Sequence, residues 1–254
     1  MRNFPETIDL ELTNKCNLKC PFCPTVNGLS TRRKGDMSQA LFLKILHECM
    51  QYKPYVRLIR FGEPTLHPYW DTIIGMLVDV GCRVRMNSNG IKLDPDKVMK
   101  SGLHDLKISV HSQAGYNAVR DMLEARGGLD YPRIEMAYLQ GEQDFGDVEG
   151  VDLVTRNPMY DLSEERVHPP CKELYTKLNV DWDGIVTACC SDYNREMRLG
   201  NLTRRGETLH SIWTTSIQLR GYRTLHEHGR SNEIPLCRRC SRSEHSSVKA
   251  AEGQ

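Results

Sequence analysis

The sequence predicts an α/β fold: a partial (β/α)6-type TIM barrel with an abbreviated last unit, followed by a small C-terminal extension of a β-hairpin plus a helix. Two observations support this prediction. Strand-like and helix-like segments alternate from residue 7 to residue 154, which indicates crossover connections and a parallel sheet. After about residue 161 short strand-like pairs appear around Asp183-Gly184, a favourable hairpin turn.

The barrel part contains six expected strands, at residues 7–12, 56–61, 82–86, 105–110, 133–139 and 151–154. Four helices are expected between them from apolar residues at helical spacing, at residues 38–52, 69–80, 94–101 and 114–125. Ser38 is a candidate N-cap and Gly81 a usual C-terminal residue. Residues 141–150 leave little room for a further helix, so we expect the barrel to stay open.

The C-terminal part is expected to hold a hairpin of residues 178–180 and 185–190, and then one helix marked by Leu209, Ile212, Trp213 and Leu219. A polar tail follows. The expected domains are residues 1–160 for the barrel, 161–241 for the extension and 242–254 for a flexible tail.

One short loop carries the most specific signal in the chain. Cys16, Cys20 and Cys23 have the spacing C-x3-C-x2-C, and Pro21 and Pro24 prevent a continuous helix there. Three thiolates can hold three irons of a [4Fe-4S] cluster and leave one iron without a protein ligand. Zinc is the main alternative, but it needs four ligands, and its usual paired C-x2-C knuckles do not match this triplet.

The composition is that of an ordinary soluble protein: 254 residues, 39% hydrophobic, 26% charged, with a formal net charge of +1. No apolar run is long enough for a membrane helix, and no signal region is evident. We therefore expect a cytoplasmic protein with no membrane partner, for which nucleic acid is an unlikely ligand. Ten cysteines in a reducing compartment point to metal, although Cys49 and Cys82 are expected to be plain buried thiols.

The cysteine loop after an N-terminal strand resembles that of the radical S-adenosylmethionine (SAM) enzymes. Phe61-Gly62-Glu63-Pro64 is similar to that family's Gly-Gly-Glu-Pro segment, with Phe61 in place of the first glycine. The resemblance implies that the open iron chelates SAM. One electron, from a donor such as flavodoxin or ferredoxin, then cleaves SAM to a 5′-deoxyadenosyl radical that abstracts a substrate hydrogen.

The resemblance also implies a set of cofactor-binding residues: Phe61, Gly62, Glu63, Asn87, Asn89, Ser109 and Arg120. The backbone of Gly62 and Glu63 would receive the methionyl amino group, and Arg120 would pair with the carboxylate. Each has a plainer alternative, since the asparagines and the serine could serve turns and Arg120 could be a solvated helix residue.

A second group of cysteines lies in the last third of the chain: Cys171, Cys189, Cys190, Cys237 and Cys240. Their arrangement resembles the SPASM auxiliary-cluster extension in its shortened, twitch form. This implies a second [4Fe-4S] cluster, held by Cys171, Cys189, Cys237 and Cys240. Neighbours on a strand point to opposite faces, so only one of Cys189 and Cys190 should face the cluster. Cys189 is preferred because its offset from Gly184 fits the family pattern, and Cys190 remains open as the ligand. A zinc knuckle is the alternative.

A fully ligated second cluster suits electron transfer. The chain therefore resembles twitch dehydrogenases of the type that oxidise 2-deoxy-scyllo-inosamine, and a hydroxyl of a small, polar, cyclitol- or sugar-like substrate is the expected target. The alternatives are a redox-neutral epimerase or rearrangement enzyme, with Cys190 as a hydrogen donor, and a peptide-modifying maturase.

The expected substrate-side residues are Arg156, Tyr160 and His111, with His168 nearby. Each could equally be a surface or packing residue. The segment Arg32-Arg33-Lys34 is expected to be a solvated loop, or to hold a phosphate.

Overall fold

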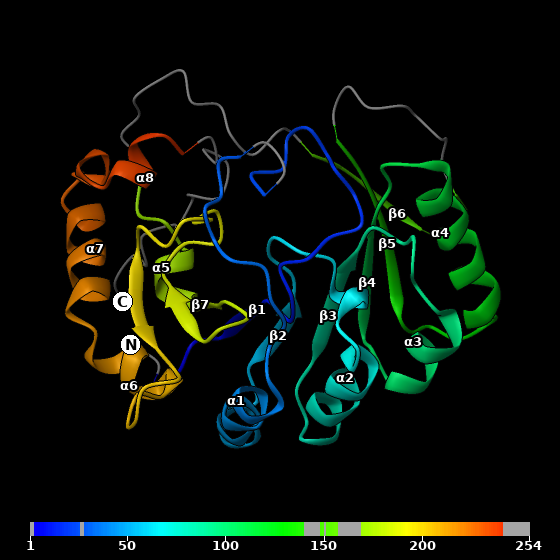
Figure 1. The fold of residues 1–254 in the computed structure, drawn as a ribbon, viewed down its shortest axis with the longest axis horizontal. Coiled ribbons are helices and arrows are strands. Elements are labelled where there is room, and N and C mark those ends of the chain that lie inside the picture. The colour runs from blue at the N-terminus through cyan, green and yellow to red at the C-terminus, as the bar shows by residue number, and fades with distance from the viewer. Residues whose placement is uncertain (1–2, 26–27, 140–147, 150, 157–168, 241–254) are drawn as a thin grey trace, which may run out of the picture.

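A single curved sheet organises the molecule. The computed structural model describes residues 3–25, 28–139, 148–149, 151–156 and 169–240. Its nine strands follow the order β6-β5-β4-β3-β2-β1-β7-β8-β9 (Figure 1). They are β1 (Thr7–Leu10), β2 (Tyr55–Leu58), β3 (Val84–Ser88), β4 (Asp105–Ser109), β5 (Arg133–Leu139), β6 (Asp152–Arg156), β7 (Lys177–Val180), β8 (Ile185–Thr187) and β9 (Arg198–Asn201).

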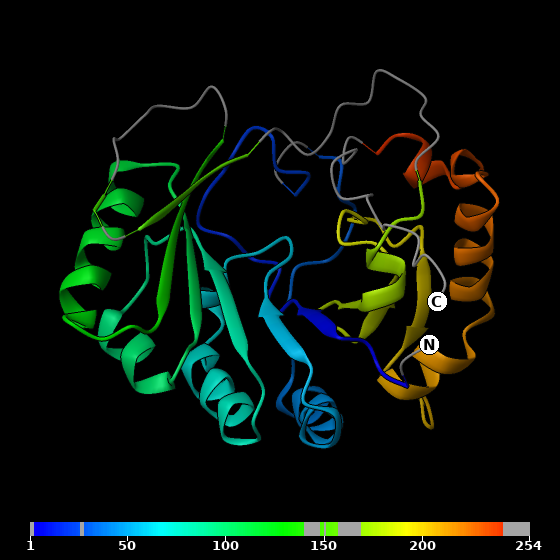
Figure 2. The same ribbon diagram turned by 180° about the vertical axis from the view of Figure 1, so that it is seen from behind.

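The helices of the barrel part alternate with its strands and lie along the outer side of the sheet, as Figures 1 and 2 show from opposite directions. The helices are α1 (Gln39–Tyr52), α2 (Trp70–Asp79), α3 (Pro95–Ser101), α4 (Gln113–Arg126), α5 (Glu173–Thr176), α6 (Leu209–Thr215), α7 (Ile217–Glu227) and α8 (Pro235–Arg238), with short 3-10 turns η1 (Pro64–Leu66) and η2 (Ser231–Glu233). Among the described residues, none of the helices is long and apolar enough to cross a membrane.

The parallel pairing of β1 to β6 confirms the predicted partial barrel. Ser38 caps α1, its side chain accepting a hydrogen bond from the Leu41 amide, as expected. Apolar residues that alternate along the strands, such as Ile8 and Leu10, are fully buried in one continuous core. In the part that the structure describes, β6 and β9 form the edges, so the sheet does not close.

Several boundaries differ from the prediction. The third strand continues to Ser88, so Asn87 lies within it. The returning strand of the hairpin ends at Thr187, so Cys189 and Cys190 follow the strand instead of lying on it. The single helix expected near Leu209 is two helices, because Ser216 is extended and its side chain caps α7 by accepting from the Leu219 amide.

The C-terminal hairpin is not a separate layer. Strand β7 pairs in parallel with β1, with Thr7 opposite Lys177, and β8 and β9 continue the sheet in antiparallel fashion. The extension therefore covers the open edge of β1 and lies directly beside the strand that leads into the first cysteine loop. The expected flexible tail, residues 242–254, falls outside the described residues.

Candidate functional site

The first cysteine loop follows β1 and crosses the top of the sheet in Figure 1. Cys16 is exposed, and Cys20 and Cys23 are partly buried. The Cys23 amide donates to the Cys20 carbonyl at 3.0 Å, and the Leu18 amide donates to Cys16 Sγ at 3.4 Å. Desolvation raises the pKa of Cys16, and the nearby Glu63 and Cys23 raise it further. Metal binding at this loop must therefore displace a proton.

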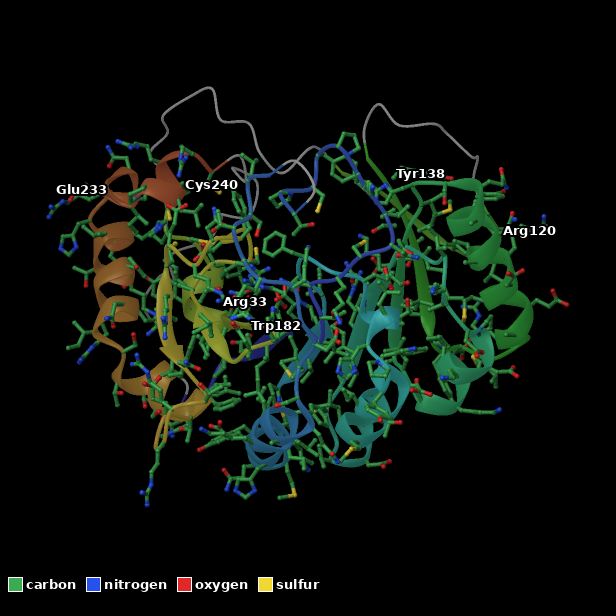
Figure 3. All side chains as sticks on the ribbon, viewed as in Figure 1. Arg33, Arg120, Tyr138, Trp182, Glu233 and Cys240 are labelled. Carbon is green, nitrogen blue, oxygen red and sulfur yellow. The ribbon has the colours of Figure 1, made fainter. Side chains whose placement is uncertain are left out.

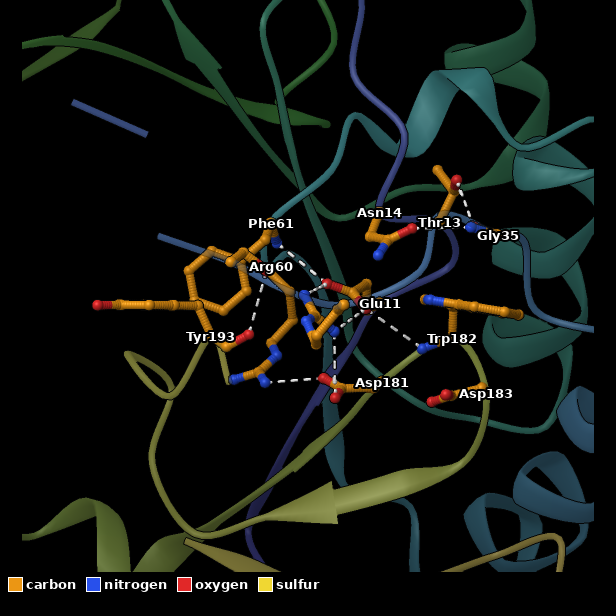
Figure 4. Close-up of polar contacts among 12 residues, drawn as sticks. Glu11, Thr13, Asn14, Gly35, Arg60, Phe61, Asp181, Trp182, Asp183 and Tyr193 are labelled. Carbon is orange, nitrogen blue, oxygen red and sulfur yellow. Dashed lines mark hydrogen bonds and ion pairs between the residues drawn. The ribbon is translucent and has the colours of Figure 1, made fainter. Parts of the chain in front are cut away.

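The base of this loop is closed by side chains of its first residues, which Figure 4 shows in part. Asn14 Oδ1 accepts from the Gly35 amide at 2.9 Å, and Asn14 Nδ2 donates to the Arg33 carbonyl at 2.8 Å. Thr13 Oγ1 donates to the Gly35 carbonyl at 2.9 Å. Gly35 lies so close to Trp182 that a Cβ there would be 2.3 Å from the indole ring.

Gly62 fits against the backbone of the same loop. A Cβ at this position would lie 2.0 Å from the Thr13 carbonyl oxygen and 2.8 Å from Asn14 Cα. Backbone atoms cannot move aside as a flexible side chain can, so glycine is required here. The Glu63 amide donates to the Lys15 carbonyl at 2.8 Å. The Gly-Glu-Pro segment is thus packed directly on the strand end that carries Cys16.

The carboxylate of Glu63 holds a different loop in place. It accepts from Ser88 Oγ at 2.8 Å, from the Asn89 amide at 2.7 Å, and from the amide and hydroxyl of Thr65 at 3.2 and 2.8 Å. Burial raises the pKa of Glu63, and these donated hydrogen bonds act against that rise. The Glu63 carboxylate is thus occupied in holding this loop as a structural clamp. The expected contact of residue 63 with the methionyl amino group would therefore be made by its backbone.

Asn89 is the expected cofactor residue that lies nearest the cysteines. Its Nδ2 donates to Asn17 Oδ1 at 2.8 Å and lies 3.8 Å from Cys16 Sγ. Asn87 accepts from Arg85 Nε at 3.3 Å on β3, and Ser109 is the half-buried last residue of β4. These three residues lie at or near the carboxyl ends of the neighbouring strands β3 and β4, at the side of the sheet where the cysteine loop lies.

Other expected site residues lie elsewhere or are not described. Arg120 is exposed on α4, and Figure 3 shows it at the outer edge of the molecule, so the structure does not support its contact with a cofactor at the cysteine loop. His111 lies beside the cysteine loop, with its ring 5.4 Å from that of Phe22. Arg156 ends β6, but its side chain, Tyr160 and His168 fall outside what the structure describes.

The later cysteines converge from three segments. Burial raises the pKa of Cys171, which precedes α5, and the neighbouring Cys190 contributes. Burial raises the pKa of Cys237 to about 12, and Cys171 and Cys240 contribute to that rise. The adjacent Cys190 and burial raise the pKa of Cys189. Thiols from the start of α5, from the loop after β8 and from α8 and its end therefore lie near one another.

These cysteines have the composition of a cluster ligand set. Thiolates that bind a [4Fe-4S] cluster are held apart by its inorganic core, and four cysteines are its usual ligand set. Cys171, Cys237 and Cys240, with one of the adjacent pair Cys189 and Cys190, can supply that set.

A buried ionic network was missed at the sequence level. Arg32 binds both carboxylate oxygens of Glu11 at 2.8 Å and lies 3.1 Å from Asp181, and Arg60 lies 2.8 Å from Asp181 (Figure 4). The side chains of all four are at most 3% exposed. The expectation that Arg32 belongs to a solvated or phosphate-binding loop is wrong, because its guanidinium is needed to pair two buried acids.

The ring of Phe61 packs against this network. The ring is buried, with the guanidinium carbons of Arg60 and Arg32 at 5.1 and 5.4 Å from its centre. It makes a T-shaped contact with Tyr193, which follows Cys189 and Cys190, with ring centres 6.2 Å apart. The substitution for the family's first glycine therefore has a packing explanation. The acidic residues that alternate along the first predicted strand, Asp9 and Glu11, are the sequence signal that could have indicated this buried ionic network.

Comparison with known proteins agrees with this site. The Radical SAM superfamily model matches residues 10–137, and an iron-sulfur cluster-binding domain model, SPASM, matches residues 171–241. The S-adenosyl-L-methionine-dependent 2-deoxy-scyllo-inosamine dehydrogenase of Niallia circulans is 22% identical over 244 residues, 92% of each chain.

Two solved structures share the fold. BtrN in complex with AdoMet and 2-DOIA superimposes with a TM-score of 0.70 and 19% identity, covering 95% of this chain and 94% of that one. SuiB of Streptococcus suis bound to the precursor peptide SuiA gives a TM-score of 0.68 at 14% identity, covering 87% of this chain and 67% of that one.

Proposed function

The chain belongs to the radical SAM superfamily, and from this premise we propose that it is an oxidoreductase acting on a hydroxyl group of a small polar substrate of cyclitol or sugar type. Its cofactors are SAM and [4Fe-4S] clusters. In this proposal residues 1–160 form the SAM-cleaving barrel and residues 161–241 the auxiliary-cluster domain. A flavodoxin or ferredoxin would supply the electron, and the protein would work in the reducing cytoplasm.

Two sets of thiols would hold the clusters. Cys16, Cys20 and Cys23 supply three ligands and leave one iron open. The second set is Cys171, Cys237, Cys240 and Cys189, with Cys190 as the other candidate for the last position. The fit of the second set is supported by the nearness of these partly buried thiols, since Cys190 acts on Cys171, and Cys171 and Cys240 act on Cys237.

When bound, SAM and the clusters would supply the radical chemistry. Reductive cleavage of SAM would release methionine, its adenosyl group would take a hydrogen atom from the substrate carbon to become 5′-deoxyadenosine, and the substrate would become a ketone by giving a proton to solvent and an electron to the auxiliary cluster. The protein's own part is placement. Glu63 fixes the turn at Ser88 and Asn89, and Asn89 reaches the Cys16 side of the loop. Gly62 lets the two loops approach closely.

The face of the sheet opposite the helices supports a polar substrate. Asp9 binds Arg57 with two contacts of 2.6 and 2.7 Å and lies 3.5 Å from Lys177. Arg85 binds Glu135 at 3.0 and 2.6 Å. These pairs make this face of the sheet polar, which is compatible with a substrate that carries hydroxyl or amino groups. His111, Arg156 and Tyr160 remain the candidate catalytic residues.

One observation carries the proposal that the two clusters act on the same substrate. Arg60, which follows β2 beside the Gly-Glu-Pro segment, donates to the carbonyls of Cys189 and Cys190 at 3.1 Å each. The loop beside the SAM site and the loop of the auxiliary cysteines are therefore in direct contact. A substrate that the radical reaches would lie close to a second redox centre.

The test is anaerobic. Reconstituted protein should contain about eight irons per chain, and turnover with aminocyclitols should yield one ketone for each 5′-deoxyadenosine. About four irons would contradict the second cluster, and 5′-deoxyadenosine without a two-electron oxidised product would contradict the dehydrogenase.

A second candidate function follows from the pairing of Cys189 with Cys190, because one thiol of the pair is not needed as a ligand. That thiol could return a hydrogen atom to the substrate in a redox-neutral epimerisation. Deuterium from solvent would then appear in a product that is not oxidised, whereas the dehydrogenase would yield a ketone.

A further inference from the structure

We infer that Arg60 is a positioning residue that holds the auxiliary-cluster loop against the SAM loop and raises the reduction potential of the auxiliary cluster. This inference rests on the proposed function, because it takes one of Cys189 and Cys190 as a cluster ligand. It concerns a residue that lies outside both cysteine motifs and before the Gly-Glu-Pro segment.

The contacts of Arg60 are concentrated on the auxiliary-cluster loop. Its Nη1 donates to the carbonyls of Cys189 and Cys190, both at 3.1 Å. Its Nη2 donates to the Asp192 carbonyl at 3.2 Å and to Thr187 Oγ1 at 3.4 Å. The guanidinium therefore meets the loop at several points between residues 187 and 192. A planar fork with several donors fixes a loop more firmly than a single point charge can.

The backbone of Arg60 is held in an unusual conformation. Its φ is 137°, in a region where non-glycine residues are rare. Such a conformation persists only where the surroundings determine it, and it is a recognised mark of functional sites. Here it turns the side chain back toward β7 and β8, while the next residues, Phe61 and Gly62, continue toward the cysteine loop.

Phe61 and Tyr193 make the connection rigid from both sides. The Phe61 ring packs on the Arg60 guanidinium and makes a T-shaped contact with Tyr193, which follows Cys189 and Cys190 in sequence. A glycine at position 61, as in the family motif, would leave this space unfilled. Phe61, which replaces the motif glycine, and the buried Arg60 thus both stabilise the contact between the SAM loop and the loop of Cys189 and Cys190.

The charge of Arg60 has a second consequence. Its side chain is 1% exposed, so solvent screens it little. Reduction adds negative charge to a cluster, and hydrogen bonds and charges around the ligands set its potential. Arg60, Arg32 and Arg195 pair with three acids, Asp181, Glu11 and Asp183, so this network is neutral as a whole. The influence of Arg60 on the cluster therefore comes from its N–H donors on the cysteine carbonyls, and its replacement by glutamine would leave the network with one negative charge in excess.

The experiment compares R60Q, R60K and R195Q as reconstituted full-length proteins. Arg195 is the matched control: it binds Asp181 and Asp183, each at 2.7 Å, and, among the described residues, it does not hydrogen-bond the carbonyls of Cys189 and Cys190. Iron and sulfide analysis, far-UV circular dichroism and a potentiometric titration followed by electron paramagnetic resonance are measured on each protein. The readout is the midpoint potential of each cluster.

We expect R60Q to keep about eight irons and to lower the midpoint potential of the auxiliary cluster by about 59 mV or more, a tenfold change for one electron. R60K should recover most of that shift, and R195Q should cause a clearly smaller one. If R60Q loads about four irons and R60K about eight, the positioning role is supported as well.

An unchanged auxiliary potential in a fully loaded R60Q protein would overturn this inference and leave the proposed function standing. An equal shift of the auxiliary potential in R195Q would also overturn it, because the loss of any positive charge from the network would then explain the shift without the contacts of Arg60 to the cysteine carbonyls. A wild-type protein that loads only about four irons would refute the proposed function itself, and the inference with it.

Discussion

Replacing Glu63 by glutamine tests the claim that its side chain is a structural clamp beside the SAM site. One carboxylate oxygen accepts from Thr65 and Ser88, and the other accepts from the Asn89 amide at 2.7 Å. A glutamine keeps one acceptor oxygen but turns an amino group toward the Asn89 amide, so that a donor meets a donor. Glu63 is 2% exposed, so water cannot compensate.

The expected cost follows from these contacts. A hydrogen bond to a charged group contributes about 1.5–3 kcal/mol. The variant loses the Asn89 bond outright and weakens the others by removing the charge, while it relieves the burial of a carboxylate. We therefore expect the free energy of unfolding of the apo protein to fall by about 2–4 kcal/mol, measured by urea denaturation. SAM affinity of the reconstituted protein should fall at least tenfold, because Asn89 and Gly62 lose their common support.

Glu48 offers a matched control. Its carboxylate is 6% exposed and accepts from the amides of Leu209 and His210 at 2.8 Å, at the start of α6. E48Q should destabilise the protein to a similar degree and leave SAM affinity, measured by equilibrium dialysis, unchanged. If E63Q lost less than about 0.5 kcal/mol, a surface-like value, or bound SAM as well as E48Q does, the reasoning would be refuted.

Three further changes test other parts of the site. Gly62→Ala should reduce iron from about eight to about four per chain, because its Cβ would lie 2.0 Å from the Thr13 carbonyl oxygen; full loading would contradict the required close approach. Cys237→Ala should also leave about four irons but retain SAM binding, and loss of SAM binding would speak against separate clusters. Asp181→Asn should destabilise the apo protein by about 3–5 kcal/mol. Burial opposes ionisation of Asp181, but Arg60 and Arg32 lower its pKa. The stabilisation that the ionised Asp181 gives to the folded protein is therefore complete above the unfolded pKa of about 3.9, and it is lost as pH falls through the lower folded pKa. Urea denaturation across pH should therefore show wild type and variant converging in acid, and a difference that grew as pH fell would contradict this sign.

The elements that could be predicted are those with local causes. Ser38 caps α1 through a hydroxyl three residues from its donor, and Gly127 ends α4. The cysteine spacing is a local pattern too, and it led to the superfamily that the comparison confirms. Such signals depend on neighbours in sequence, so they can be found without knowledge of the tertiary structure.

The pairing of β7 with β1 could not be found in this way. It joins segments from opposite ends of the barrel, and nothing in either strand specifies the other beyond a shared apolar alternation. The end of β8 was misplaced for a related reason. A register irregularity at Val186 and Thr187 ends the strand before Cys189, so an argument from alternating strand faces did not apply to the adjacent cysteines.

The ionic network shows where sequence reasoning reaches its limit. Acidic residues on the inner face of a parallel strand, such as Asp9 and Glu11, are costly to bury without a partner. Their presence in a predicted barrel strand therefore implies a buried cation. It does not identify that cation, because any of the 34 lysines and arginines could fill the role. Arg32 was assigned to solvent because its two charged neighbours made the whole segment look exposed, yet it alone of the three turns inward to Glu11. A buried acid thus predicts that a salt bridge exists, and only the folded chain shows which loop it ties down.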